Sequence, residues 1–168
     1  MYFKGMTISA PGSAVRQRRF DSPEQEVYLN LWRTYDRLRG IEDELFVHHD
    51  LTAQQYNALR LLRAAHPKKV PTLHIAGRLI SRAPDITRMI DRLAERGLVE
   101  RERPADNRRV VMVGITEAGK KLLNEIAPEV RECHARQLGH LSAAEMRTLV
   151  ELLKKARGPH ETDSSDWR

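Results

Sequence analysis

Residues 84–116 read PDITRMIDRLAERGLVERERPADNRRVVMVGIT, and this stretch decides the fold. Its first part predicts an amphipathic helix at 84–96, because apolar residues recur there at the three- and four-residue spacings of one helical face. Those residues are Ile86, Met89, Ile90 and Leu93. Gly97 is expected to end the helix in a left-handed conformation. Two β-prone runs, at 98–103 and 109–116, then predict a hairpin around the turn PADNR.

A shorter helix is expected directly upstream, at about 72–80. Two prolines in HPKKVPTL (66–73) interrupt any helix before it, and Thr72 is expected to cap its start. The tight turn SRAP (81–84) separates it from the next helix. Two helices around a tight turn, followed at once by a hairpin, form a winged helix-turn-helix.

Longer helices are predicted on both sides of this module. Ser or Thr followed three residues later by Glu or Gln marks a helix start, because the two residues satisfy free backbone donors reciprocally. Such pairs occur at Ser22–Gln25, Thr52–Gln55 and Ser142–Glu145. A further helix should run from about Thr116 toward Leu138, where Pro128 is expected to bend or locally break it.

The first and last of these helices each carry an apolar face. Its members are Val27, Leu31, Leu38 and Leu45 in the first helix, and Met146, Leu149, Leu152 and Leu153 in the last. This is more apolar surface than one helix pair needs, which favours contact with a second copy of the chain. Folding back on the same chain is the alternative.

The positive charge of the chain is concentrated in one segment. The sequence has 29 Lys and Arg against 23 Asp and Glu, a formal net charge of +6. Residues 60–109 hold 13 of the basic and 6 of the acidic residues, which leaves 16 and 17 for the rest of the chain. Since one segment holds the whole excess, a polyanionic partner is favoured over a general role in solubility.

Several other classes of protein are disfavoured. Cys133 is the only cysteine, so no intramolecular disulfide is possible and nothing indicates an oxidising compartment. No apolar run has the length of a membrane span, and the first residues lack the apolar core of a signal peptide. The sequence also lacks a nucleophile elbow, a P-loop and a spaced metal motif. We therefore expect a cytoplasmic protein that is not an enzyme and has no catalytic residues, metal or cofactor.

The stretches LTAQQYNALRLL (51–62) and SRAPDITRMIDRLAERGLVERERPADNRRVVMVGITEAGKKLL (81–123) resemble the multiple antibiotic resistance regulator (MarR) family of bacterial transcription factors. The resemblance covers residues 23–157 in element order and is most specific in the second stretch. It implies a mainly α fold with a small β-wing, a winged helix-turn-helix flanked by N- and C-terminal dimerisation helices. It also implies a homodimer on a pseudo-palindromic operator in double-stranded DNA, with recognition helices in major grooves one turn, ~34 Å, apart.

The expected organisation follows from the motifs and the resemblance together. A flexible arm at 1–21 precedes an N-terminal dimerisation helix at 22–50. The DNA-binding module occupies 51–115, and C-terminal dimerisation helices follow at 116–157. A polar tail at 158–168 ends the chain. The expected function is transcriptional repression that a small molecule relieves.

The resemblance places DNA contacts on the recognition helix, at 84–96, and on the wing. The expected contacts are Arg82, Pro84, Asp85, Thr87, Arg88, Arg92, Asp106, Arg108 and Arg109. Thr87 can donate to a phosphate or contact a thymine methyl, and Arg88 can bind guanine O6 and N7 with both arms. Asp85 could accept from a cytosine amino group, but a role as helix cap that also positions a neighbouring arginine is favoured.

In the wing, Asp106 and Arg108 match the family pattern in which an Asp precedes by two residues an Arg that enters the minor groove. The carboxylate would orient the guanidinium before DNA arrives, and Arg109 would be a lesser phosphate contact. The alternative is that these three residues form only a turn-stabilising ion pair. Farther along the recognition helix, Arg92 and Arg96 are candidates for phosphate contact or for ion pairs with acidic neighbours on the same helix.

The resemblance also implies a small-molecule effector, often aromatic, in a cleft between the dimerisation helices and the winged helix. The candidates to line that cleft are Leu45, His48, His49, Tyr56, Leu59 and Leu62. Apolar walls with a few polar groups suit an aromatic carboxylate or a phenol. The same residues could instead form ordinary core.

Three alternatives remain beside the effector-controlled DNA-binding regulator. Adjacent histidines on a helix point about 100° apart, so His48 and His49 are poorly placed to bind one metal ion together. A redox role for Cys133 competes with its default role as a small buried apolar residue. The winged helix could also bind an acidic protein instead of DNA; a strong salt dependence with a preference among DNA sequences would distinguish the two.

Overall fold

The structure, a computed structural model, describes residues 20–80, 85–105 and 107–161. The chain divides into two compact units, one ending at Asp36 and the other beginning at Arg37. No helix within the described residues has both the length and the apolar character needed to cross a membrane. All elements of the winged helix-turn-helix belong to the second unit.

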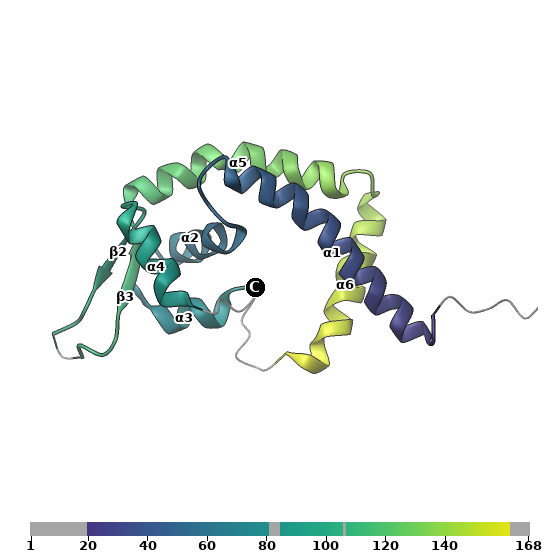
Figure 1. The fold of residues 1–168 in the computed structure, drawn as a ribbon, viewed down its shortest axis with the longest axis horizontal. Coiled ribbons are helices and arrows are strands. Elements are labelled where there is room, and N and C mark those ends of the chain that lie inside the picture. Colours follow the sequence, from purple (N-terminus) through teal and green to yellow (C-terminus); the bar gives the residue numbers. More distant parts are fainter. Residues whose placement is uncertain (1–19, 81–84, 106, 162–168) are drawn as a thin grey trace, which may run out of the picture. The chain divides into compact units, whose positions relative to one another are not determined.

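The described residues form helices and one small sheet (Figure 1). The helices are α1 (Pro23–Val47), α2 (Ala53–Ala65), α3 (Thr72–Arg78), α4 (Ile86–Glu95), α5 (Glu117–Leu138) and α6 (Ala143–Arg157), followed by a 3-10 turn, η1 (Gly158–His160). The strands are β1 (Val70–Pro71), β2 (Val99–Glu102) and β3 (Met112–Ile115). They pair antiparallel in the order β1-β3-β2. This is the mainly α fold with a small β-wing that the sequence predicts.

The three helix starts predicted from Ser or Thr followed by Glu or Gln are confirmed, with one difference in detail at the first. The reciprocal capping bonds at Thr52 and at Ser142 both form. At the start of α1 the Ser22 hydroxyl accepts from the Gln25 backbone N–H at 3.2 Å, as expected. The Gln25 side-chain carbonyl, however, accepts from the backbone N–H of Asp21 at 2.7 Å, and the Gln25 side-chain amide donates to the Asp21 carboxylate at 3.0 Å.

The start of α3 differs from the prediction that Thr72 caps it. Pro71 is the N-cap and makes no side-chain capping bond. The Thr72 hydroxyl instead donates to the carbonyl of Val111 at 3.1 Å, and the Thr72 backbone N–H donates to the same oxygen at 3.0 Å. The reason is β1, which the sequence did not predict: Val70 pairs with Val113 and thereby brings Val111 next to the helix start. The prediction for Thr72 was therefore wrong.

Pro128 does not break α5, which continues as a helix from Glu117 to Leu138. A proline at this position removes the N–H that would bind the carbonyl of Asn124. Both Pro128 and Asn124 are exposed, so water can supply the missing donor. Of the two outcomes expected at Pro128, the local break is therefore wrong, and the bend stays a prediction.

The core of the second unit lies among α2, α3, α4, the sheet and α5. Its largest fully buried side chains are Phe46, Leu59, Leu62, Ile75, Ile90, Leu93, Leu123, Ile126 and Val113. Helix α4 contributes the predicted stripe, with Met89, Ile90 and Leu93 buried and Ile86 half-buried. Burial of this stripe fixes which face of α4 points outward.

The last turns of α1 lie beside α5. The side-chain amide of Gln137, itself buried, donates to the carbonyl of Leu38 at 2.8 Å. Glu42 lies 4.0 Å from His134, measured from Oε1 to Nε2. Burial raises the pKa of Glu42 above its ordinary value of 4.5; the charge of His134 opposes this rise and that of Asp43 adds to it.

Glu42→Gln is expected to stabilise the protein near neutral pH. Between the ordinary pKa of 4.5 and its raised value, the folded chain holds a proton that the unfolded chain releases, so stability is lost as the pH rises. Glutamine removes this loss. Urea unfolding should therefore show a higher free energy of unfolding for the variant at about pH 7.5 and little difference at about pH 4. An equal change at both values would contradict the assigned burial effect.

Candidate nucleic-acid interface

The recognition helix α4 begins with a carboxylate cap. Asp85 is the N-cap residue, and its Oδ1 accepts from the backbone N–H of Arg88 at 2.9 Å. This satisfies one of the free donors of the first turn. The capping role expected for Asp85 is therefore present. Arg82 and Pro84 lie outside the described residues.

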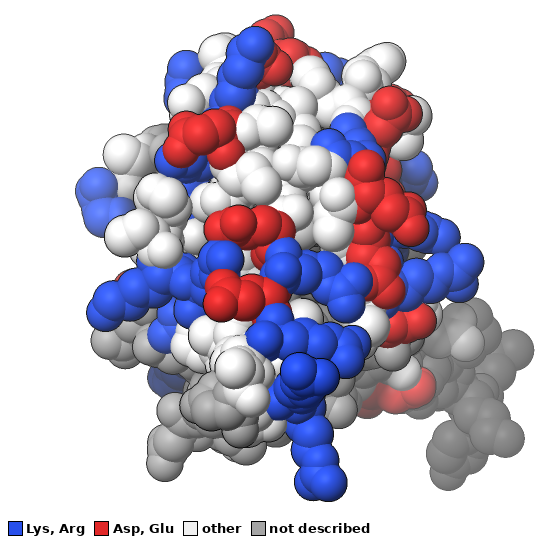
Figure 2. All heavy atoms as spheres, turned by 90° about the vertical axis from the view of Figure 1, so that its left-hand side faces the viewer, with Lys and Arg blue, Asp and Glu red and all other residues white. Residues whose placement is uncertain are grey.

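The outward face of α4 carries the side chains that were expected to contact DNA. Thr87, Arg88 and Arg92 are exposed, on the side opposite the buried stripe. Arg88 and Arg92 form no ion pair with any residue that the structure describes. Figure 2 shows Lys and Arg side chains gathered in the lower part of the face that carries the wing, with Asp and Glu between them.

The other end of α4 is fixed by backbone geometry and by Arg96. Gly97 has a φ of 67°, the left-handed conformation predicted for it. The guanidinium of Arg96 donates through Nη2 to the carbonyl of His49 at 3.1 Å and through Nη1 to the carbonyl of Asp50. Arg96 is thus bound to the turn between α1 and α2, whereas the sequence suggested an acidic neighbour or a phosphate.

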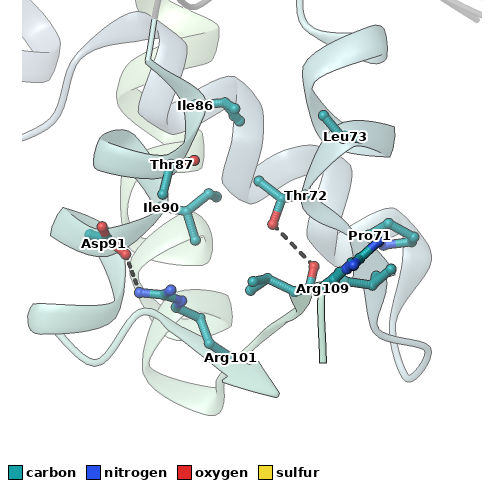
Figure 3. Close-up of a pocket in the computed structure, with 11 residues that line it drawn as sticks. Pro71, Thr72, Leu73, Ile86, Thr87, Ile90, Asp91, Arg101 and Arg109 are labelled. Atoms are coloured by element: carbon teal, nitrogen blue, oxygen red, sulfur yellow. Dashed lines mark hydrogen bonds and ion pairs between the residues drawn. The ribbon is translucent and has the colours of Figure 1, made fainter. Parts of the chain in front are cut away.

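An ion pair joins the recognition helix to the wing. Arg101 of β2 donates through Nη1 to Oδ1 of Asp91 on α4, and both side chains are partly exposed (Figure 3). Asp91 is therefore not the partner of Arg92 or Arg96. Because the pair joins two elements, it restrains the wing relative to α4. Sequence spacing did not predict this ion pair, because its two residues lie in different elements.

The described part of the wing tip forms a tight turn. Asn107 accepts from the backbone N–H of Arg109 through its side-chain oxygen, at 3.2 Å, and from the N–H of Val110 through its carbonyl, also at 3.2 Å. Such an Asn side chain imitates a backbone turn. Arg108 and Arg109 follow it and are both exposed. Asp106, the expected brace for Arg108, lies outside the described residues.

Lys69 is held on the sheet by two glutamates. Its Nζ lies 2.7 Å from Oε2 of Glu102 and 3.3 Å from Oε1 of Glu100, both on β2. A β-carbon added at Gly114 would lie 3.0 Å from Cγ of Lys69, so the lysine stem runs close over that glycine. The hydrogen bond with Glu102 is the largest cause of a raised pKa at Lys69. Lys69 therefore offsets one of the two negative charges that precede the wing tip.

A pocket of about 370 Å³ lies between α3, α4 and the base of the wing (Figure 3). The residues that line it are Pro71, Thr72, Leu73, Ile86, Thr87, Ile90, Asp91, Arg101, Arg109, Val110 and Val111. Most of its wall is apolar, and its polar atoms come from two guanidinium groups, two hydroxyl groups and the carboxylate of Asp91. Asp91 pairs with Arg101, which leaves Arg109 as the cation without an anionic partner among the lining residues. Such a lining suits a small molecule that combines an apolar body with an anionic group.

The structure brings four of the six residues expected to bind an effector into or against one core, and leaves the two histidines outside it. Four of them belong to the core or pack against it: Leu45, Tyr56, Leu59 and Leu62. Leu59 and Leu62 are fully buried, and Tyr56 packs on Phe46 with ring centroids 4.7 Å apart. His48 is exposed, whereas Nε2 of His49 lies 3.1 Å from Oε2 of Glu129 on α5.

Nothing among the described residues supports a metal or redox sensor. In this part of the chain no three His, Cys, Asp or Glu side chains are grouped so that they could hold a metal ion. Cys133 is buried, and burial is the largest cause of a raised pKa for its thiol. A raised pKa disfavours the thiolate, which is the reactive form of cysteine.

Comparison with known proteins identifies the family. Residues 51–111 match the model of the MarR family. An uncharacterized HTH-type transcriptional regulator of Bacillus subtilis, YpoP, is 30% identical over 129 residues, which cover 74% of this chain and 86% of that protein. The comparisons therefore confirm the resemblance to the MarR family that the sequence motifs indicated.

Two solved structures extend the similarity to the whole fold. A MarR transcription factor from Planctomyces limnophilus is 59% identical, with a TM-score of 0.66 over 81% of this chain and 98% of that one. BpsR of Bordetella bronchiseptica, whose DNA binding is regulated by 6-hydroxynicotinic acid, is 27% identical, with a TM-score of 0.71 over 78% of this chain and 98% of that one. The chain thus belongs to the MarR family of DNA-binding, winged helix-turn-helix transcriptional regulators.

Proposed function

We propose that this regulator is a dimeric repressor that binds a pseudo-palindromic operator through α4 and the wing, and that a small aromatic anion releases it. The observation that carries the proposal is the outward face of α4. Thr87 and Arg88 stand exposed there on a helix whose start is capped and whose opposite face is buried. Side chains held in this way can reach base edges in a major groove.

We assign the proposed roles to the segments that the sequence predicts. Residues 51–115 bind DNA, while 22–50 and 116–157 supply the dimer contacts. Apolar side chains remain exposed on α1, including Val27, Tyr28, Leu31, Trp32 and Tyr35, and on α6, including Met146, Leu149, Val150 and Leu152. A second copy of the chain would remove these side chains from water.

Selection of bound sequences from random duplexes tests the proposed function. A symmetric dimer with two recognition helices should select two half-sites of opposite orientation about 10 base pairs apart, centre to centre. The absence of any preferred sequence would contradict the proposal and would favour a winged helix that binds an acidic protein instead.

Arg108 is the proposed minor-groove residue, and Arg108→Ala is expected to weaken operator binding by about 1 to 3 kcal/mol while the dimer stays intact. Arg109→Ala should have a smaller effect that is equal for all duplexes, because a phosphate contact carries no sequence information. Fluorescence anisotropy with operator and shuffled duplexes measures both effects. Unchanged operator affinity after loss of Arg108 would remove the wing from the proposed interface.

The pocket beside α4 supports the proposed release by a small aromatic anion. Arg109 offers a guanidinium group and Thr87 a hydroxyl group beside an apolar wall, while Arg101 is already paired with Asp91 and the Thr72 hydroxyl donates to Val111. A carboxylate bound there would lie next to Thr87, one of the residues proposed to contact DNA. A ligand in this pocket would lie beside the proposed DNA contacts, which accounts for release of DNA. The cleft predicted from the sequence is less suitable, because Leu59 and Leu62, two of its expected lining residues, are fully buried in the core.

6-Hydroxynicotinic acid is a suitable probe, because it combines an aromatic ring with a carboxylate. We expect it to reduce operator binding by the wild-type protein and to lose this effect in Leu73→Glu, which places a negative charge on the pocket wall at an exposed position outside the proposed DNA contacts. Calorimetry without DNA separates binding of the probe from release of DNA. Release that persists unchanged in the variant would place the effector elsewhere.

A further inference from the structure

We propose that Arg96 is a positioning residue for operator recognition: it holds the C-terminal end of α4 on the α1–α2 turn and does not touch DNA. The inference rests on the proposed role of α4 as the recognition helix. Three sets of contacts carry it, and together they join the end of α4 to α1 and to α5.

The first set is the pair of bonds made by the Arg96 guanidinium. It donates to the carbonyls of His49 and Asp50, two consecutive residues just after α1. Asp50 has a φ of 52°, a left-handed conformation that few side chains favour, and this turns the chain sharply here. Backbone carbonyl oxygens are strong acceptors and a guanidinium carries several N–H donors in a planar fork, so Arg96 can bind both carbonyls of this turn together. Arg96 therefore binds a defined backbone feature.

The second set connects the same turn to α5. Nε2 of His49 lies 3.1 Å from Oε2 of Glu129, which is in the middle of α5. The His49 side chain is 20% exposed and that of Glu129 is 51% exposed. The residue whose carbonyl accepts from Arg96 thus uses its side chain to bind the long helix.

The third set connects the start of α5 directly to the end of α4. The Thr116 hydroxyl donates to the carbonyl of Gly97 at 2.6 Å, and the Thr116 N–H donates to the carbonyl of Leu98 at 3.1 Å. At Gly119 an added β-carbon would lie only 2.3 Å from the Leu98 carbonyl oxygen, so the two backbones are in close contact. Helix α5 therefore binds the end of α4 directly through its first turn, and indirectly through Glu129, His49 and Arg96.

These contacts hold α4 at one end, while the proposed base-reading side chains lie toward the other. At 1.5 Å per residue, Arg88 lies about 12 Å along the helix axis from Arg96. A tilt of only about 5° at Arg96 would therefore move Arg88 by roughly 1 Å, enough to weaken a bidentate hydrogen bond to a base. Loss of the Arg96 contacts should thus impair base readout although the residue itself reads no base.

The competing interpretation is that Arg96 binds a DNA phosphate, since a guanidinium has donors beyond the two used here. The two interpretations differ in salt dependence. Removing a phosphate contact lowers the slope of log affinity against log salt by about one and weakens all duplexes alike. Removing a positioning contact lowers affinity for the operator selectively and leaves the slope unchanged.

The experiment compares Arg96→Ala and Arg96→Lys with Arg92→Ala, a matched change at an exposed arginine one turn earlier. Anisotropy titrations over a range of salt concentrations use the selected operator and a shuffled duplex. For Arg96→Ala we expect operator affinity to fall about tenfold, with unchanged affinity for the shuffled duplex and an unchanged salt slope. Arg96→Lys should recover little of the lost operator affinity, because lysine lacks the planar fork of donors that binds both carbonyls. At a phosphate contact, lysine would replace arginine well.

A second variant tests the same chain of contacts where folding is not at risk. Glu129→Ala removes the partner of His49 from an exposed position, and Glu125→Ala, at an exposed glutamate one turn earlier, is its control. We expect Glu129→Ala to lower operator affinity about threefold without a change in slope, and Glu125→Ala to have no effect. If Arg96→Ala does not fold, the comparison of Glu129→Ala with Glu125→Ala decides whether these contacts position α4.

Two results would overturn the inference. One is unchanged operator affinity in Arg96→Ala or, if that variant does not fold, unchanged operator affinity in Glu129→Ala. The other is a fall in the salt slope of about one in Arg96→Ala, restored by lysine, which would assign Arg96 to a phosphate. If the wild-type protein prefers no sequence, the proposed function itself fails, and that outcome is seen before any variant is made.

Discussion

Gly119→Ala is expected to destabilise the protein by about 1 to 3 kcal/mol, although alanine is the better helix former. Gly119 lies in the first turn of α5, and its backbone is in contact with the turn between α4 and β2. An added β-carbon would lie 2.3 Å from the carbonyl oxygen of Leu98 and 2.8 Å from Cγ1 of Ile115. The oxygen belongs to the backbone, so relief of the clash requires α5 to move away from the winged helix.

Urea unfolding measures this effect, with Gly40→Ala as the control. Gly40 also lies within a helix, α1, but an added β-carbon there meets nothing within 4 Å. The control should therefore gain about 0.5 to 1 kcal/mol from helix propensity alone. A stabilising effect at both glycines would show that α5 is not packed tightly against the α4–β2 turn.

Arg88→Ala is expected to weaken binding to the selected operator by about 1 to 3 kcal/mol and to relax the preference at one base position. Arg88 lies in the first turn of α4, where the Asp85 cap fixes its backbone, and its side chain is free of ion pairs with described residues. Affinity for a shuffled duplex should change much less. Anisotropy titration on a panel of operator variants measures both quantities.

Arg92→Ala is the control for this change, since Arg92 lies one turn farther from the start of α4. As a phosphate contact it should weaken all duplexes alike and reduce the salt slope by about one. An equal loss on every duplex after Arg88→Ala would make Arg88 a phosphate contact too. In that case sequence preference must come from Thr87 or from residues in the turn before α4.

Local sequence signals predicted most of the elements because each signal acts within one element. The apolar stripe of α4, the left-handed Gly97 and the capping residues at Thr52 and Ser142 all appear in the structure as expected. The β-prone runs likewise became β2 and β3. Each of these features is decided by contacts within a few residues along the chain.

Contacts between distant segments could not be predicted in this way. Strand β1 has only two residues, and it exists because Val70 pairs with Val113 of β3. That pairing redirects the hydroxyl of Thr72 from a helix cap to a strand carbonyl. The continuous course of α5 through Pro128 likewise depends on exposure to solvent, which spacing alone does not show.

The same limit applies to the candidate site. Spacing predicted the exposed face of α4, because a buried stripe determines the opposite face of a helix. The roles of the wing arginines came from the resemblance to the family. Spacing did not predict that Arg101 binds Asp91 or that Arg96 binds the α1–α2 turn, since both partners come from other elements. The pocket was missed for the same reason, because its lining comes from β1, α3, α4, β2 and the wing segment 109–111, which meet only in the folded chain.

The central claim is that α4 and the wing read a specific DNA sequence. The most direct measurement is the affinity of the wild-type protein for the selected operator and for a shuffled duplex of equal length, titrated by anisotropy at several salt concentrations. We predict that the operator binds at least about 10³-fold more tightly near physiological salt, and that log affinity falls linearly with log salt for both duplexes. Equal affinity for the two duplexes at every salt concentration would contradict the claim.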